Sequence, residues 1–279
     1  MALVHQYYGG DGVPIAVPGG PHEIAAAWRS HRQRLRTWFL GLGDAEWSGA
    51  TRCTEWRVLE LAQHLISGSQ FLGYTLHQSR KGEATRLLAG FDSQRTAAVT
   101  AAQFAGLPPG DLLERLNAVD AQVEHEIESL VGDEWVNPAE APPGQVPAYV
   151  AVNHFLFDSW VHERDMMLPA NQIPATEPNE AAMVASYVVA LTGVARRVGE
   201  SAPSQAPLRM RLSDIDRCIR VDVTEGRASV SFTEPDGDAE FCARAADIVD
   251  FATGRKIEGE LPADQSVIGF LSRLAAVMA

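Results

Sequence analysis

Apolar residues in the first 170 positions recur at the three-to-four-residue spacing of amphipathic helices. This spacing predicts five helices, over 21–42, 55–80, 93–105, 110–131 and 147–169. Thr54 is the expected N-cap of the second helix, and the Pro-rich stretch 137–144 is read as a linker before the last one. Long helices in this arrangement favour a four-helix bundle with a core that can hold a site built from facing side chains.

From residue 208 onwards the pattern changes to strict alternation, which predicts half-buried strands over 208–212, 219–223 and 228–232. The sequence Thr224-Glu225-Gly226-Arg227 fits a turn between the second and third strands. Helices are expected over 179–198, over 243–253 with a stop at Gly254, and over 264–278. The predicted fold class is therefore α+β: an N-terminal arm (1–20), a helical bundle (21–170) and a small α+β domain (171–279).

The composition excludes several functional classes. Asp and Glu outnumber Lys and Arg by 36 to 23 and no basic stripe is present, which argues against a nucleic-acid partner. Three cysteines without a CxxC pair argue against a thiolate zinc site and a disulfide framework, and favour a reducing compartment. No apolar run reaches about 18 residues, so no membrane association is expected. The N-terminus also lacks the layout of a signal peptide, and a cytoplasmic location is expected.

The predicted helix over 147–169 carries a row of polar side chains with metal-ligand chemistry. His154, Asp158 and His162 lie four residues apart and therefore share one helix face. Asp158 and His162 are two candidate ligands, His64 from another helix is a third, and His154 competes for the same role. Two imidazoles and one carboxylate resemble catalytic zinc sites and the facial triad of non-haem iron, both with an open position. The alternatives are an exposed Asp–His pair and a core histidine at position 64.

Three segments resemble the mycothiol-dependent maleylpyruvate isomerase family. The first is a Thr-x-Cys-x-x-Trp loop that enters a helix with a turn-spaced acid and histidine, in residues 51–65. The second is the carboxylate-x-x-x-His-x-x-Asp pattern of Asp158, His162 and Asp165. The third is the segment 245–255, which ends in Gly254-Arg255. The resemblance implies a DinB-like metal-binding four-helix bundle followed by the family's α+β C-terminal domain.

The same resemblance implies roles for individual residues. His64, Asp158 and His162 would bind a divalent metal, usually Zn²⁺, with mycothiol as the usual thiol co-substrate. Asp165 would accept a hydrogen bond from a ligand imidazole and fix its tautomer, and its alternative is a solvated acid at a helix end. Arg255 would bind a substrate carboxylate through its guanidinium, and its alternative is a surface arginine.

Two positions depart from the family pattern: Asp158 stands where Glu is common, and Arg164 where an aromatic residue is common. The expected function is a metal-dependent enzyme in which a thiolate attacks a small electrophile. S-transfer is favoured over cis–trans isomerisation, because the N-terminal extension and Glu163-Arg164 indicate divergence. Cys53 is read as a loop cysteine and not as a nucleophile. The rival hypotheses are a non-catalytic metal-binding module and a metal-free ligand-binding protein, and both monomer and homodimer remain open.

Overall fold

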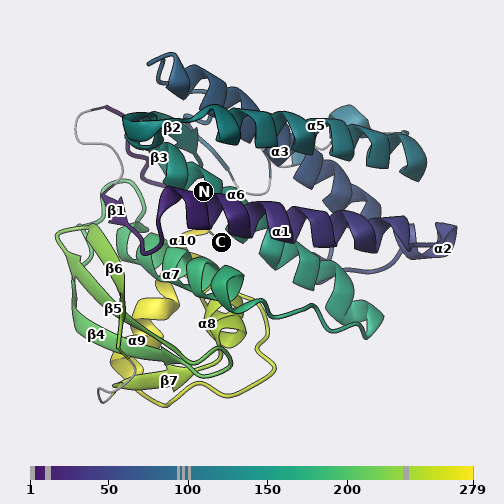
Figure 1. Ribbon diagram of the computed structural model, residues 1–279. Coiled ribbons are helices and arrows are strands. Elements are labelled where there is room, and N and C mark those ends of the chain that lie inside the picture. The colour runs from purple at the N-terminus through teal and green to yellow at the C-terminus, as the bar shows by residue number, and fades with distance from the viewer. Residues whose placement is uncertain are drawn as a thin grey trace. The chain divides into compact units, whose positions relative to one another are not determined.

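The computed structural model of the chain describes residues 4–9, 14–92, 95, 98–99, 102–234 and 239–278 (Figure 1). The chain divides into two compact units. One unit is Pro21–Ala175, and the other combines Met1–Gly20 with Thr176–Ala279. The first unit is mainly helical and the second is built on a sheet, so the predicted α+β class is confirmed.

Long helices make up most of the described part of the unit Pro21–Ala175 (Figure 1). Helices α1 and α3 each pack against both α5 and α6, which closes the predicted four-helix bundle. The short helix α2 contacts α3 at one end. The bounds are α1 (Pro21–Leu40), α2 (Asp44–Trp47), α3 (Val58–Arg80), α5 (Pro109–Ser129) and α6 (Ala148–Met167).

The apolar stripes expected from the sequence face the bundle interior. Leu35 and Phe39 of α1, Leu61 and Leu65 of α3, and Leu116 of α5 belong to one buried cluster. Helix α6 begins directly after Pro147 and ends before Pro169, as expected for a residue type that lacks a backbone N–H. The helix that carries the candidate ligands is therefore a central member of the bundle.

The structure of this unit differs from the sequence prediction at the start of α3 and in the stretch 137–147. Helix α3 begins at Val58 and not after Thr54, because the Glu60 carboxylate accepts a hydrogen bond from the Arg57 amide (2.9 Å) and so caps the helix there. The predicted linker is wrong: β2 (Pro138–Ala141) and β3 (Gly144–Pro147) form an antiparallel hairpin. The predicted helix over 93–105 lies largely outside the described residues, and its described end is the 3-10 turn η1 (Ala102–Phe104).

The second unit contains a five-stranded sheet in the order β1-β6-β5-β4-β7. The three predicted strands are confirmed, and they form the antiparallel centre of the sheet. Glu225 and Gly226, at φ 50° and 75°, make the predicted two-residue turn between β5 and β6. The strands are β1 (Ile15–Ala16), β4 (Gln205–Leu212), β5 (Arg217–Thr224), β6 (Arg227–Thr233) and β7 (Phe241–Ala243).

Helix α7 (Pro178–Val194) covers the sheet by packing on β1, β5 and β6. It comes close because Gly193 has no side chain: a Cβ there would lie 2.8 Å from Val223 and Ala228. Helix α8 (Ala245–Ala252) packs on α7 and is followed by Gly254 at φ 76°, the predicted C-terminal glycine. The predicted last helix is two helices, α9 (Gln265–Leu271) and α10 (Arg273–Met278), which Ser272 separates.

The described part of the predicted N-terminal arm belongs to the sheet unit. The His5 amide donates to the Arg196 carbonyl at 2.9 Å, and Ile15–Ala16 pairs in parallel with β6. Strands of two or three residues, such as β1 and β7, are too short to show an alternating pattern. They are recognised as strands only in the structure, from their pairing with the longer strands β6 and β4.

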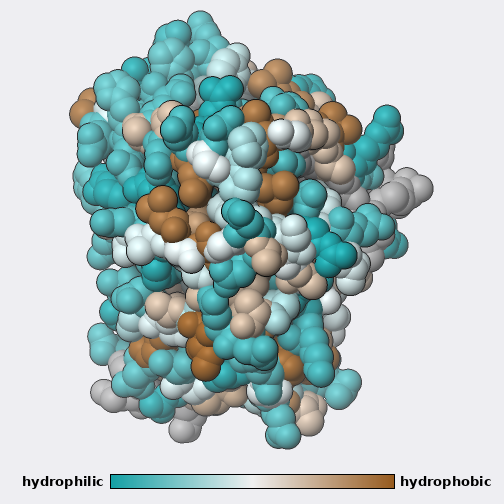
Figure 2. All heavy atoms as spheres, turned by 90° about the vertical axis from the view of Figure 1, so that its right-hand side faces the viewer, coloured by the Kyte–Doolittle hydropathy of each residue, from teal (hydrophilic) through white to brown (hydrophobic). Residues whose placement is uncertain are grey.

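The described helices include none that is long and apolar enough to cross a membrane. On the face drawn in Figure 2, hydrophobic side chains lie in small groups between polar ones. Among the residues coloured there, no single large apolar patch stands out. Scattered apolar groups of this kind are ordinary on protein surfaces.

Candidate metal centre

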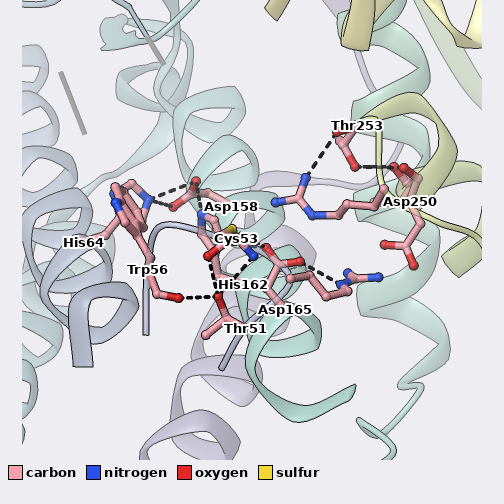
Figure 3. A network of polar contacts seen from close by, with 12 residues as sticks. Thr51, Cys53, Trp56, His64, Asp158, His162, Asp165, Asp250 and Thr253 are labelled. Carbon is pink, nitrogen blue, oxygen red and sulfur yellow. Dashed lines mark hydrogen bonds and ion pairs between the residues drawn. The ribbon is translucent and has the colours of Figure 1, made fainter. Parts of the chain in front are cut away.

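Three potential ligands from two helices of the bundle converge on one point. His64 lies on α3, and Asp158 and His162 lie one turn apart on α6. One ligand atom from each residue lies within 4.8 Å of the others. Figure 3 shows His64 pointing at the Asp158 carboxylate from the opposite helix. The side chains are partly buried, at 16%, 23% and 12% exposure for His64, Asp158 and His162.

The spacing of these atoms fits a small divalent ion. The Nε2 atom of His64 lies 3.2 Å from Asp158 Oδ2, and Nε2 of His162 lies 3.5 Å from Asp158 Oδ1. A tetrahedral Zn²⁺ with bonds of about 2.0–2.2 Å separates its ligand atoms by about 3.3–3.6 Å. Two imidazole nitrogens and one carboxylate are also the donor set of catalytic zinc sites. The residues present therefore fit the metal that the sequence resemblance implies.

The tautomer of His162 supports the same conclusion. Its Nδ1 atom lies 2.9 Å from Asp165 Oδ2, so Nδ1 carries a proton and donates it to the carboxylate. The neutral ring then presents the Nε2 lone pair to Asp158, which is itself an acceptor. Two facing acceptors repel unless a cation or a second proton lies between them. A ligand imidazole with its other nitrogen bound to a carboxylate is the usual arrangement at metal sites.

The charges around the three side chains favour a positive charge at this centre. Burial would lower the pKa of His162, but the Asp158 carboxylate, together with Asp165, outweighs burial and holds that pKa well above its ordinary value. Burial likewise raises the pKa of Asp158, yet His64 and His162 hold it well below its usual range. A metal ion must therefore displace a proton from this cluster when it binds.

Asp158 reaches both histidines although its side chain is one methylene shorter than that of the family's common Glu. Its carboxylate oxygens lie 3.2 Å from His64 Nε2 and 3.5 Å from His162 Nε2, so the shorter acid still spans the distance between α3 and α6.

Asp165 is fully buried, so it is not the solvated acid of the alternative interpretation. It lies beside Cys53, whose thiol donates to Asp165 Oδ2 at 3.3 Å. Cys53, His162 and Asp165 form a second group with potential ligand atoms. The Arg52 guanidinium, 2.8 Å from Asp165 Oδ1, places a positive charge at this group and disfavours a cation there. We therefore interpret Cys53 and Asp165 as hydrogen-bonded support for His162 and not as part of a second metal site.

The His154 ring packs against aromatic side chains of its own helix. Its ring makes edge contacts with Phe155 and Phe157 at centroid distances of 5.2 and 5.9 Å. Burial lowers its pKa to about 4, so the ring is neutral at physiological pH. Among the described residues, it belongs to neither group of potential ligands.

The His154→Ala variant is therefore expected to retain bound metal. The substitution removes a buried ring but none of the converging nitrogens, so metal content per chain should equal that of the wild type. Elemental analysis after exhaustive dialysis measures this, with His162→Ala as the comparison variant that loses the ion. Loss of metal from His154→Ala would show that His154 binds the ion and that the proposed ligand set is wrong.

Arg255 lies in the other unit, three positions after the last residue of α8. Its backbone amide donates to the Asp250 carbonyl at 2.7 Å, and its guanidinium donates to the Thr253 carbonyl at 3.4 Å. These contacts tether the arginine to the end of α8. Its role in binding a substrate carboxylate remains a prediction from the sequence.

Sequence reasoning missed two residues next to the centre. Arg52 binds Asp165, and the Trp56 ring lies 5.2 Å from the His64 ring. Both belong to the Thr-x-Cys-x-x-Trp loop, which served only to mark the resemblance. The motif itself was the available signal, because a loop that directly precedes a ligand-bearing helix can contact the ligands.

Fold and site together define a class: a helical bundle with a His₂-carboxylate centre, joined to an α+β unit. Residues 18–167 match the sequence profile of the mycothiol maleylpyruvate isomerase N-terminal domain, and this match covers more than half of the chain. The chain therefore belongs to that family.

Two solved structures share the fold. The mycothiol-dependent maleylpyruvate isomerase superposes with a TM-score of 0.62 at 17% identity, over 89% of this chain and 94% of that one. A histidine-to-alanine mutant of the mycothiol-dependent maleylpyruvate isomerase gives the same TM-score at 16% identity, with the same coverage. No curated protein sequence matches the chain significantly. At this identity the structures establish a common fold over most of both chains.

Proposed function

We propose that this protein is a divalent-metal-dependent enzyme that activates mycothiol for attack on a small electrophilic substrate. The observation that carries the proposal is the convergence of His64, Asp158 and His162 at ligand spacing in the bundle. Membership in the mycothiol maleylpyruvate isomerase N-terminal domain family supports the choice of thiol. Two imidazoles and a carboxylate in one partly buried group are the donor set that such an ion needs.

The chemistry follows from the residues around the centre. A divalent cation held by His64, Asp158 and His162 would stabilise a thiolate at its open position near neutral pH. Asp165 keeps the His162 proton on Nδ1, and this leaves Nε2 free to bind the ion. Arg255 is the proposed partner of a carboxylate on the electrophile, in line with the family resemblance. The chain thus supplies orientation and charge for a sulfur nucleophile.

The attack on carbon has two possible outcomes. S-transfer results if the thiolate displaces a leaving group and stays, and isomerisation results if it adds to an activated double bond and leaves again after bond rotation. Of the two features that favoured S-transfer, Glu163-Arg164 has structural partners in the bundle: Glu163 binds Arg34 at 3.1 Å, and the Arg164 guanidinium stacks on Trp160 at 5.0 Å. Because both side chains stabilise packing, we place the proposal at the attack of the thiolate on carbon, the step that both reactions share.

The shared step can be tested without knowing the electrophile. Mycothiol added to the Zn²⁺-loaded protein is expected to show thiolate ultraviolet absorbance at a pH where free mycothiol is protonated. The Asp158→Asn variant, similar in size but without the charge, should show none. Loaded protein that leaves mycothiol protonated would support the rival of a non-catalytic metal-binding module. Mass spectrometry with candidate electrophiles then distinguishes an S-conjugate from an isomer with unchanged thiol.

A further inference from the structure

We propose that the loop of residues 51–57 fixes the orientation of both histidine ligands, with Arg52 and Trp56 as positioning residues. The inference rests on the proposed metal site and assigns this loop a role in building it. The loop joins α2 to α3 and is closed at its base by a bridge between Ala50 and Arg57. A different residue of the loop acts on each histidine: Arg52 on His162 and Trp56 on His64.

Arg52 acts on His162 through Asp165. Its guanidinium Nε lies 2.8 Å from Asp165 Oδ1, and its backbone amide donates to the Asp165 carbonyl at 3.0 Å. The loop therefore holds both the side chain and the backbone of Asp165. The other carboxylate oxygen, Oδ2, accepts from His162 Nδ1 at 2.9 Å. A fully buried carboxylate needs such a charged partner to keep its place.

The loop has internal hydrogen bonds that make it a defined structure. The Thr51 hydroxyl accepts from the Cys53 amide at 3.1 Å and lies 2.7 Å from the Trp56 carbonyl. The Trp56 amide donates to the Cys53 carbonyl at 2.8 Å. The Cys53 thiol adds a third contact from the loop to Asp165. These bonds link the Arg52 end of the loop to the Trp56 end, and Figure 3 shows them beside the centre.

Trp56 acts on His64 by packing. The two rings lie 5.2 Å apart at an interplanar angle of 47°, and the His64 ring meets the His162 ring edge-on at 4.9 Å. The Nδ1 atom of His64 is buried and has no hydrogen-bond partner among the described residues. Within the described part of the chain, no carboxylate therefore orients His64 through Nδ1, in contrast to His162. Contact with the tilted tryptophan ring takes over that task.

The proposal predicts that the loop tunes metal affinity while contributing no ligand. Removing an outer partner of a metal ligand typically weakens metal binding by about 10–100-fold. We expect losses in this range for Arg52→Gln and for Trp56→Leu. Arg57→Gln is the matched control, because Arg57 is an exposed arginine of the same loop. It should bind metal within about twofold of the wild type.

The experiment is competition for Zn²⁺ between each full-length variant and a chromophoric chelator, with the spectrum of the Co²⁺-loaded protein as a second readout. Because Arg52 acts through Asp165, Arg52→Gln combined with Asp165→Asn should bind no more weakly than Asp165→Asn alone. Additive losses, or wild-type affinity in both single variants, would overturn the proposal. Arg52→Lys, which keeps the charge, should recover part of the affinity and serves if Arg52→Gln does not fold.

Failure of this inference differs from failure of the proposed function. If the wild type itself binds no Zn²⁺, the metal site is wrong and the loop has nothing to orient. If the wild type binds Zn²⁺ and the loop variants bind it equally well, the site stands and the loop is only a helix connection. An unchanged Co²⁺ spectrum in Trp56→Leu would count against the role of that residue in placing His64.

Discussion

Alanine in place of His64 is expected to lower metal affinity by more than about 100-fold, above the usual effect of removing an outer partner. His64 is the proposed ligand on α3, opposite Asp158 and His162, so its loss would leave proposed donors from α6 alone. Without a stably bound ion, thiolate formation and any thiol-dependent turnover should disappear together. Chelator competition and the ultraviolet thiolate signal measure the two effects on the same preparation.

His77 provides a matched control on the same helix. It is 38% exposed and pairs with Glu126 at 3.1 Å, near the C-terminal end of α3. His77→Ala should keep wild-type metal affinity and thiol activation. If His64→Ala behaves like His77→Ala, the histidine at position 64 is the satisfied core residue of the alternative hypothesis.

Alanine in place of Asp120 is expected to destabilise the bundle by about 3–5 kcal/mol, because it leaves the buried Arg32 guanidinium without its counter-charge. Asp120 on α5 is fully buried and accepts from Arg32 at 2.9 Å and from Arg36 at 3.0 Å. Ser69 of α3 donates to it at 3.3 Å, and Arg32 also donates to Ser159 of α6 at 2.9 Å. One polar cluster therefore ties all four long helices together.

Urea unfolding followed by circular dichroism measures this loss of stability. The control is Glu128→Ala on the same helix, since Glu128 is 67% exposed and lies 3.7 Å from Arg29. Exposed ion pairs contribute about 0–1 kcal/mol, so this variant should unfold close to the wild type. If Asp120→Ala lowers the free energy of unfolding by less than about 1 kcal/mol, water or a rearrangement replaces the lost carboxylate beside the arginines. The polar cluster would then contribute little to the stability of the bundle.

The sequence predicted the long elements well because their signal is local. The bundle helices and the three central strands each repeat their pattern several times within one segment. Thr54 as the N-cap was wrong because the Glu60 side chain caps α3 later in the chain, a choice that propensity alone does not determine. The β2–β3 hairpin was missed because its prolines indicated a break.

The candidate site could be predicted only in part. The His and Asp spacing on α6 identified Asp158 and His162 as proposed ligands, and the motif that leads into α3 identified His64. The contact between Arg52 and Asp165 spans 113 positions, and that between Arg32 and Asp120 spans 88. No periodicity within a helix encodes such pairs. They depend on which helix faces meet, and only the packed bundle shows this.

The most direct test of the proposed metal centre is the metal content of protein purified without a histidine tag, measured by elemental analysis after reconstitution and dialysis. We expect one divalent ion per chain in the wild type and essentially none in His64→Ala or His162→Ala. A folded wild type that holds no stoichiometric metal, with both variants indistinguishable from it, would show that His64, Asp158 and His162 do not bind a metal.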